Sequence, residues 1–398
     1  LGHGRHTKPM SGDVNALDGT TRLLMDQTNA VLDGLAAGSE PVALLGHSMA
    51  TDILVRVARE RDDIGPVVLI SAFSQVIDGA FPQDLLLVTG SWEPGLRGFA
   101  LEAAQMVDPA ATEGETVVAG DVRRRAVVGP LTEHVSILQS RAGRAEAVAW
   151  IDGFYNRQSD LHILPTGTAI LGLLAGIVLL FRPIARRIPQ RQFVSPELNW
   201  KQTALLLGLP AVLTAFIAVP LTPEFLPVLV ADYLGLHLFI YAVMQLVVLW
   251  FFGVRGGPFN GFAVVLVLIW CAVFGALLDR YVANFWPTSQ RLWIIAALTL
   301  GAIPYMLADT ILTANAGFWR RLLIRSAFLI SLGIAVALDF GGLFFLIMIA
   351  PVLVLFYLVF GTMGRWVAVK AGPAAPGFAL GLVLAWALGV SFPLFVGM

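Results

Sequence analysis

The chain has 398 residues, of which 57% are hydrophobic and only 13% are charged, against about a quarter in an average soluble protein. This composition excludes a wholly soluble globular protein and a disordered one. The formal net charge of −1 gives no support for nucleic-acid binding, and the single cysteine, Cys271, excludes an intrachain disulfide and a cysteine metal cluster.

The charged residues divide the chain into two parts. Residues 1–160 contain 13 Lys/Arg and 21 Asp/Glu, whereas residues 161–398 contain 13 Lys/Arg and only 6 Asp/Glu. The proportion of charged residues in the first part is typical of a soluble domain, and the proportion in the second part is typical of a membrane domain. We therefore predict a soluble domain over residues 1–158 and a polytopic transmembrane helical domain over residues 159–398.

The chain opens on Leu1-Gly2-His3-Gly4-Arg5-His6, a pattern typical of a loop that follows a strand. This pattern leads us to expect that a full-length version carries upstream strands, an oxyanion loop and an export signal or membrane anchor.

Strand and helix patterns alternate in the soluble part. Helical spacing of apolar residues predicts helices over 13–37, 51–60, 96–106 and 144–155. Short apolar runs predict strands over 41–45, 66–70 and 85–89, with weaker candidates at 117–118 and 126–128. Such alternation indicates an α/β fold, a parallel sheet with helices on both faces.

A candidate nucleophile follows the first predicted strand. In Gly46-His47-Ser48-Met49-Ala50 a serine stands between small residues two positions away on either side, as a sharp strand-to-helix turn requires. The Met49 N–H could then face a developing oxyanion, a contact worth about 3–4 kcal/mol. The alternative is a helix-capping serine without chemistry.

Two further candidates follow later strands. Glu93 lies in the turn Gly90-Ser91-Trp92-Glu93-Pro94-Gly95, and His134 lies in the loop containing Glu133-His134-Val135. A solvated loop acid and a surface histidine are the alternatives. The chain order Ser48, Glu93, His134, each after a predicted strand, favours a Ser-acid-His triad over those alternatives.

These three motifs resemble the α/β-hydrolase family, and the opening glycine turn is similar to one that follows the family's fourth strand. The chain is similar to bacterial α/β-hydrolases fused to a multi-span membrane domain. The resemblance covers about residues 1–155 and implies Ser48 as nucleophile, His134 as general base, Glu93 as the acid that orients it and Met49 as an oxyanion donor.

The chain departs from the family pattern in three places. Ala50 replaces a glycine, and the upstream oxyanion loop is absent from this chain. The family acid is more often an aspartate, so Asp78, Asp84 and Asp108 compete with Glu93, which we prefer because it follows a buried strand within a tight glycine-rich turn.

Eight apolar stretches are long enough to cross a membrane. They are 163–181, 202–221, 226–252, 259–279, 291–313, 322–338, 341–361 and 376–396. Eleven basic residues fall on the odd-numbered loops and only Arg280 and Arg291 on the even ones. This bias predicts cytoplasmic odd loops and hence an extracytoplasmic hydrolase domain. Together with the resemblance to bacterial hydrolases, it implies an integral protein of a bacterial inner (plasma) membrane.

Few polar side chains interrupt the spans: Asp232, His237, Asp309, Asn315 and Arg325. Asp279 and Asp339 also fall near span ends, where we favour a simple membrane-interface role over a polar cavity. For Asp232 and His237 both interpretations stay open.

We therefore expect a membrane-anchored serine hydrolase that cleaves an ester, thioester or amide of a small-molecule or lipid-like acyl substrate through an acyl-enzyme. The alternative is a membrane transport or assembly protein whose hydrolase-like domain binds without turnover. His3, His6 and His47, even with Asp13, lack the spacing of a metal site, so we expect no metal ion and no cofactor.

Overall fold

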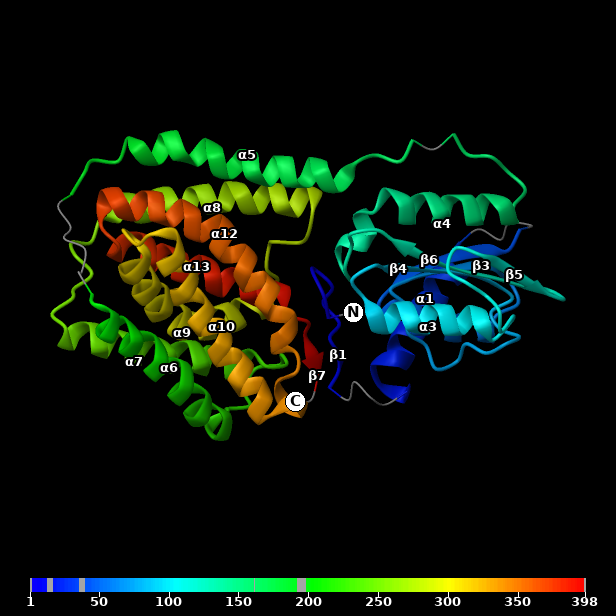
Figure 1. Ribbon diagram of the computed structural model, residues 1–398, viewed down its shortest axis with the longest axis horizontal. Helices are drawn as coiled ribbons and strands as arrows, with labels where there is room; N and C mark the ends of the chain where they lie inside the picture. Colours follow the sequence, from blue (N-terminus) through cyan, green and yellow to red (C-terminus); the bar gives the residue numbers. More distant parts are fainter. Residues whose placement is uncertain (1, 13–16, 36–39, 161, 192–197, 397–398) are drawn as a thin grey trace. The chain divides into compact units, whose positions relative to one another are not determined.

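The computed structural model describes residues 2–12, 17–35, 40–160, 162–191 and 198–396 (Figure 1). The chain divides into two compact units. The sheet unit is Asp13–Leu171, and the helical unit joins Leu1–Gly12 to Gly172–Met398. The division falls within helix α5 (Thr166–Arg186), later than the boundary after residue 158 that the sequence predicts.

The opening segment differs from the expectation that it belongs with the sheet. Strand β1 (Met10–Ser11) pairs in parallel with β7 (Phe395–Val396) in the helical unit. The buried Arg291 donates to the carbonyl oxygen of Gly2 at 2.8 Å. These hydrogen bonds group residues 2–12 with the helices.

Five strands form the sheet in the order β2-β3-β4-β6-β5. Their bounds are β2 (Val42–His47), β3 (Ile64–Ile70), β4 (Asp84–Gly90), β5 (Thr116–Ala119) and β6 (Val122–Gly129). Neighbouring strands are parallel except β5, which runs antiparallel to β6. The predicted α/β class is confirmed, and the carboxyl ends of β2, β3, β4 and β6 meet at one edge.

Helices cover both faces of this sheet (Figure 1). They are α1 (Arg22–Asp33), which follows a π-helical turn (Leu17–Thr21), α2 (Met49–Glu60), α3 (Pro94–Gln105) and α4 (Arg141–Phe154). The ends of the first predicted helix, 13–16 and 36–37, lie outside the described residues. Helix α4 begins after Ser140, whose Oγ accepts from the Gly143 N–H at 3.2 Å and so satisfies one donor of the first turn.

Alternate residues of the central strand β4 enter two separate apolar cores. Leu85 and Leu87 pack in the core that holds α1, α2 and α3, whereas Leu86 and Val88 pack in the core that holds α4. This alternation follows from the two-residue period of a strand. All four side chains are almost fully buried, so β4 forms the rigid centre of the unit.

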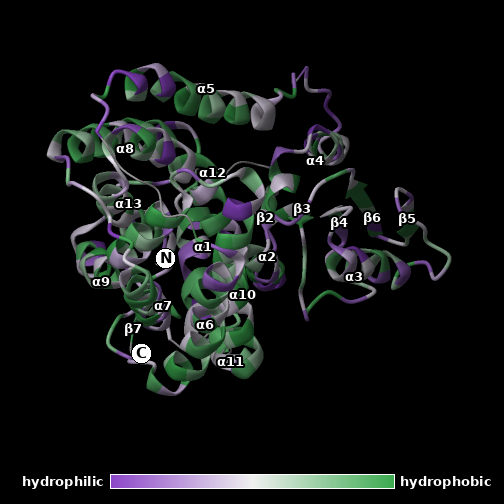
Figure 2. Cartoon of the chain, turned by 60° about the vertical axis from the view of Figure 1, so that its left-hand side comes forward, coloured by the Kyte–Doolittle hydropathy of each residue, from purple (hydrophilic) through white to green (hydrophobic). Residues whose placement is uncertain are grey.

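In the described part of the helical unit, eight helices are long and apolar enough to cross a membrane. They are Thr166–Arg186 (α5), Trp200–Leu221 (α6 with a short 3-10 extension, η3), Ala231–Phe251 (α7), Gly261–Tyr281 (α8), Ser289–Thr313 (α9), Phe318–Leu338 (α10), Leu346–Ala371 (α12) and Ala374–Ser391 (α13). In Figure 2 the ribbons of these helices are coloured mainly as hydrophobic residues. The eight predicted spans are confirmed, and they indicate an integral membrane protein.

The seventh span begins later than predicted. Asp339 accepts from the Gly342 N–H at 3.0 Å and caps a separate short helix, α11 (Phe340–Leu343). Helix α12 begins at Leu346 and extends to Ala371, beyond the predicted end of this span at residue 361, so it contains Arg365 within its length.

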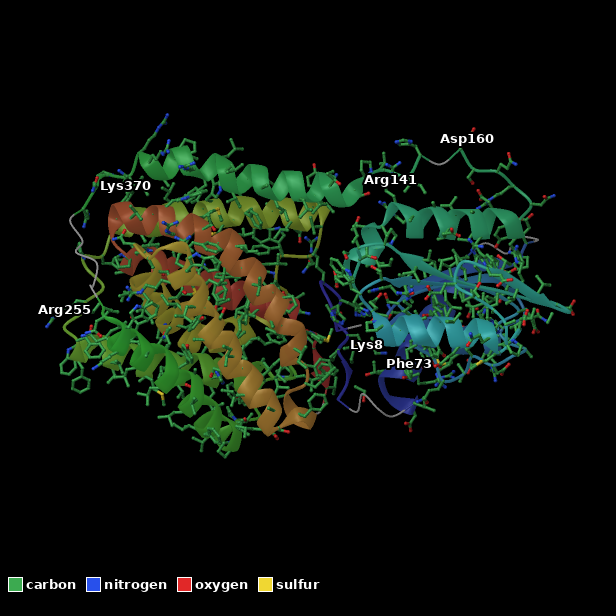
Figure 3. The ribbon with its side chains drawn as sticks, viewed as in Figure 1. Lys8, Phe73, Arg141, Asp160, Arg255 and Lys370 are labelled. Atoms are coloured by element: carbon green, nitrogen blue, oxygen red, sulfur yellow. The ribbon has the colours of Figure 1, made fainter. Side chains whose placement is uncertain are left out.

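Basic residues of the odd-numbered loops gather at one end of the helical unit. The Arg191 N–H donates to the Lys370 carbonyl at 2.8 Å, which joins the first loop to the last turn of α12. Figure 3 shows Arg255 and Lys370 at this end and Lys8 at the other. The carboxyl-terminal strand β7 lies at the even-loop end, because the Phe395 N–H donates to the Pro227 carbonyl at 2.9 Å.

Two sets of buried polar side chains inside the helical unit are paired with one another. Arg325 donates to both carboxylate oxygens of Asp309, at 3.1 and 3.0 Å. His237 lies between the hydroxyls of Tyr233 and Ser331, at 2.8 and 2.9 Å. Such pairing lowers the cost of placing polar groups in an apolar bundle.

Candidate active site

Ser48 occupies a strained turn between β2 and α2. Its backbone has φ of 57° and ψ of −127°, a conformation that costs a non-glycine residue of order 1–3 kcal/mol. A Cβ at Gly46 would lie 2.6 Å from Leu54 Cδ1 and 3.4 Å from the Ala50 carbonyl oxygen, so a side chain at this position would require Leu54 to move. The Thr51 hydroxyl donates to the Ser48 carbonyl at 2.6 Å and helps to hold the turn.

Glu93 follows β4, and only 7% of its surface is exposed. Its Oε2 accepts from the Gly90 N–H and from the Ser71 hydroxyl, each at 2.7 Å. A Cβ at Gly90 would lie 2.5 Å from the Thr132 carbonyl oxygen and 2.9 Å from Glu93 Oε2. The glycine is therefore required for the carboxylate to reach the backbone of its own turn.

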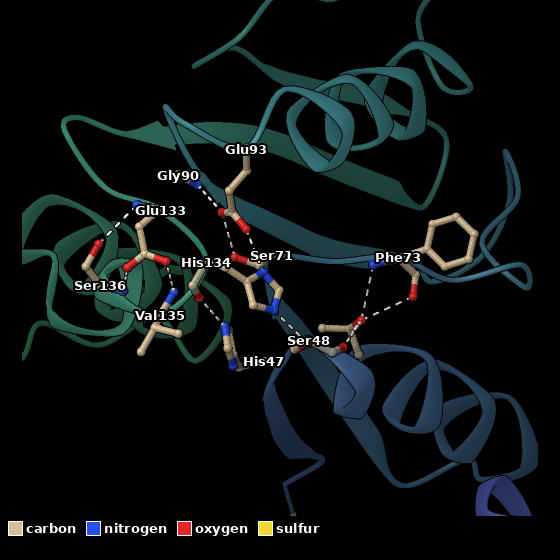
Figure 4. Close-up of polar contacts among 11 residues, drawn as sticks. His47, Ser48, Ser71, Phe73, Gly90, Glu93, Glu133, His134, Val135 and Ser136 are labelled. Atoms are coloured by element: carbon tan, nitrogen blue, oxygen red, sulfur yellow. Dashed lines mark hydrogen bonds and ion pairs between the residues drawn. The ribbon is translucent and has the colours of Figure 1, made fainter. Parts of the chain in front are cut away.

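His134 follows β6 and joins the other two predicted residues (Figure 4). Its Nδ1 lies 2.7 Å from Glu93 Oε1, and its Nε2 lies 2.8 Å from Ser48 Oγ. A carboxylate only accepts hydrogen bonds, so Nδ1 carries the proton and Nε2 can accept from the Ser48 hydroxyl. The His134 side chain remains 36% exposed, which leaves this end of the arrangement open to a substrate.

The carboxyl edge of the sheet brings these residues together. Ser48, Ser71, Glu93 and His134 follow β2, β3, β4 and β6, which lie side by side in that order. The sequence prediction missed Ser71. The signal was present, because Ser71 also comes directly after a buried parallel strand, where ligands and reacting groups collect in open α/β sheets.

His47 holds the loop that carries His134. Its Nε2 donates to the His134 carbonyl at 2.6 Å, and the two rings lie 4.9 Å apart. Burial lowers the pKa of the His47 imidazole, because the charged form is poorly solvated there. His47 thus packs beside the turn, as the sequence indicated, but it also fixes the backbone of the candidate base.

Glu133 organises the same loop. Its carboxylate accepts from the Val135 N–H at 2.9 Å and the Ser136 N–H at 2.8 Å. Burial opposes ionisation, but these hydrogen bonds prevail and lower the pKa of the Glu133 carboxyl. Glu133 belongs to the Glu133-His134-Val135 motif, but the sequence analysis did not predict that it would organise this loop.

The three competing aspartates lie elsewhere. Asp78 accepts from Arg59 at 2.5 Å, Asp84 accepts from Arg123 at 2.8 Å, and Asp108 accepts from the Ala110 N–H at 2.9 Å. Asp84 begins β4, at the opposite edge of the sheet from His134. Of the four candidate carboxylates, the structure brings Glu93 to the histidine.

Met49 is the first residue of α2, so its N–H has no acceptor within the helix's own hydrogen-bond ladder. It follows Ser48 directly, at the positive end of the helix dipole. Among the described residues, no group of three or more His, Cys, Asp or Glu side chains is placed to hold a metal ion; Asp13 lies outside the described residues.

Comparisons of this chain with protein-family models, curated proteins and solved structures give no match.

Proposed function

We propose that this protein is a membrane-anchored serine hydrolase of the α/β-hydrolase type, which cleaves an ester, thioester or amide. The observation that carries the proposal is the continuous hydrogen-bond chain from Ser48 Oγ through His134 to Glu93, with contacts of 2.8 and 2.7 Å. A helix-capping serine alone would not require a histidine and a buried carboxylate in line with it.

In the proposed reaction, Ser48 Oγ attacks the carbonyl carbon of the substrate while His134 Nε2 accepts the hydroxyl proton. His134 then gives this proton to the leaving group, and an ester of Ser48 remains. Water attacks that ester with His134 again accepting a proton, which releases the acid and restores Ser48. Glu93 holds the imidazole through Nδ1 and stabilises its positive charge.

The Met49 N–H is the proposed donor to the oxyanion that forms during both attacks. A donor at the start of α2 gains from the helix dipole, and removal of one such donor costs about 3–4 kcal/mol in a characterised hydrolase. Its backbone position directly after Ser48 supports this assignment.

Exposed apolar side chains on the same loops support an acyl substrate. Met49, Phe73, Trp92 and Leu131 are each more than half exposed, although they follow the four strands that carry the polar groups of the site. Apolar surface of this kind favours an acyl chain over a charged group.

The charge distribution supports a location at a bacterial plasma membrane with the hydrolase domain outside the cytoplasm. Arg191 and Arg255 lie in loops at one end of the helical unit, and Lys370 lies in the last turn of α12 at the same end. The positive-inside rule assigns this end to the cytoplasm. The segment before α5 would then emerge on the other side.

A covalent probe tests the proposal. A fluorophosphonate bearing a fluorophore should label the full-length chain, and Ser48→Ala should abolish the labelling. Ser91→Ala serves as a control, because it removes a hydroxyl in the Glu93 turn that has no hydrogen-bond partner among the described residues and leaves Ser48 in place. Absence of labelling in a folded wild-type chain would favour the alternative, a transport or assembly protein with a non-catalytic domain.

A further inference from the structure

A carboxylate in the helical unit is only half satisfied. Asp232, in the first turn of α7, has 9% of its surface exposed. Its Oδ2 accepts from the N–H groups of Leu226 at 3.0 Å and Phe225 at 3.3 Å. Within the described part of the chain its buried Oδ1 has no hydrogen-bond partner, and no basic side chain lies within 4.0 Å of the carboxylate.

This carboxylate lines an apolar pocket of about 370 Å³ between α7 and α9. The other lining residues include Phe225, Leu226, Gly235, Phe239 and Leu298. Helices α7 and α9 approach closely here, since a Cβ at Gly301 would lie 2.3 Å from the Gly235 carbonyl oxygen. Gly235 itself leaves space, because its own Cβ would meet only Leu298 Cδ2, at 3.6 Å.

The pocket lies at the even-loop end of the helical unit. Its rim is formed in part by the segment before α7, and the adjacent Pro227 carbonyl accepts from the C-terminal Phe395 N–H. Phe225 and Phe239 are 67% and 45% exposed. Apolar side chains at the end of a membrane span face the boundary between lipid headgroups and acyl chains, where an amphiphile can place its head and its chain together.

We propose that this pocket binds an amphiphile with a primary ammonium head and an apolar chain. The ammonium enters beside Asp232 and donates to its carboxylate, which requires a rotation of the side chain that exposes the buried Oδ1, and the chain lies against Phe225, Phe239 and Leu298. A buried carboxylate without a counter-charge is costly, and a hydrogen-bonded cation reduces that cost. A single free oxygen supplies too few ligands for a calcium or magnesium ion.

This inference is independent of the proposed hydrolase activity. The same chemistry has two sources, the headgroup of a phosphatidylethanolamine and a free long-chain amine. The experiment therefore uses the full-length chain in phosphatidylcholine nanodiscs, because choline carries a cation without an N–H donor.

One arm measures binding of dodecylammonium by native mass spectrometry, with dodecanol as the neutral comparison. The other arm uses phosphatidylethanolamine and phosphatidylcholine probes with a photoreactive acyl chain, and maps the cross-links. We expect dodecylammonium, or the phosphatidylethanolamine probe, to bind at least tenfold better than its comparison, with cross-links at residues 225–239 and 297–300. Success in either arm supports the proposal and identifies the source.

Asp232→Asn is the decisive variant. The asparagine oxygen can still accept from Leu226 and Phe225, while its NH₂ group replaces Oδ1 and presents donors to the pocket. The preference for the ammonium head should fall at least tenfold in this variant. Asp339→Asn is the matched control, since Asp339 is also a carboxylate near a span end but does not line this pocket.

Gly235→Leu provides a second variant, which fills the apolar part and leaves the carboxylate intact. It should also weaken binding, with circular dichroism confirming that the helices remain. Absence of a preference in both arms, with equal binding of dodecanol and dodecylammonium and of the two lipid probes, would overturn the proposal. Binding that depends on Gly235 but not on Asp232 would do the same, because it would reveal a purely apolar groove.

Discussion

Buried carboxylates differ between the sheet unit and the helical unit. Glu93 accepts from His134, Ser71 and Gly90, so both of its oxygens have partners. Asp309 accepts from Arg325 with both oxygens, whereas Asp232 has partners on Oδ2 alone. Among the described residues, one buried carboxylate therefore contacts a histidine, a second pairs with a cation between helices, and a third keeps one oxygen without a hydrogen-bond partner.

The largest expected effect concerns Ser48 and His134, because only the sheet unit combines its carboxylate with a nucleophile. Ser48→Ala or His134→Ala should lower turnover of a short acyl ester by about 10⁴- to 10⁶-fold. The double variant should be little worse than either single variant, since the residues act as one unit. Additive losses, measured as kcat/KM, would contradict a shared mechanism, and full activity in Ser48→Ala would end the hydrolase proposal.

Replacement of the orienting carboxylate should have the next effect. Glu93→Gln should reduce kcat by about 10³- to 10⁴-fold, because the imidazolium loses its counter-charge and the preferred proton position on His134. Asp78→Asn and Asp108→Asn should leave kcat nearly unchanged, as both side chains lie with other partners. Loss of activity in either aspartate variant, with retention in Glu93→Gln, would reassign the acid.

In the helical unit, removal of the partner of a buried carboxylate should lower the free energy of unfolding. Arg325→Met leaves the Asp309 carboxylate buried without its cation, which should cost about 3–5 kcal/mol of unfolding free energy. The double variant Asp309→Leu, Arg325→Met should cost less, because no unpaired charge remains. Thermal unfolding in detergent measures both, and a double variant that is worse than Arg325→Met would show that the pair itself is required.

Ser71 tests whether both oxygens of Glu93 need partners. Ser71→Ala removes one hydrogen bond to a charged group, a loss of about 1.5–3 kcal/mol, and leaves the Gly90 N–H in place. We expect kcat to fall about ten- to a hundredfold with KM little changed. Ser71→Cys keeps a weak donor of similar size and should lose less activity than Ser71→Ala, which would distinguish loss of the hydrogen bond from a packing defect.

The smallest expected effect is the contribution of His47 to stability, and this contribution depends on pH. Its folded pKa lies below its ordinary value of 6.5, so the unfolded state binds the proton first and stability falls as the pH decreases below about 6.5. One group contributes at most about 1.4 kcal/mol per pH unit. The groups that act on its charge are His134, Glu93 and Glu133.

Hydrogen exchange of the loop around His134 measures this dependence locally. Protection should decline between pH 7 and 5 in the wild type, and His47→Gln should flatten the decline because glutamine does not titrate. An unchanged pH profile in His47→Gln would assign the acid sensitivity to another group.

Much of the fold follows from the local sequence pattern. Apolar runs of about 20 residues can satisfy their backbone in lipid only as helices, so the eight spans were predictable without a structure. Short apolar runs such as Leu85–Leu87 predicted a strand covered on both faces. The chain order of Ser48, Glu93 and His134, each after a strand, also came from the sequence alone.

The tertiary structure decided which of these groups meet. The strand order β2-β3-β4-β6 brings His134 to Ser48, although they lie 86 residues apart in the sequence. It also places Ser71 beside Glu93, so that the Ser71 hydroxyl donates to the Glu93 carboxylate. Separate helices likewise bring Arg325 to Asp309, while a backbone turn uses one oxygen of Asp232 and leaves the other free. The spacing of apolar residues and the polarity of the side chains specify each helix and strand. Hydrogen-bond partners depend instead on strand register and on packing between distant segments, and the local sequence pattern contains neither.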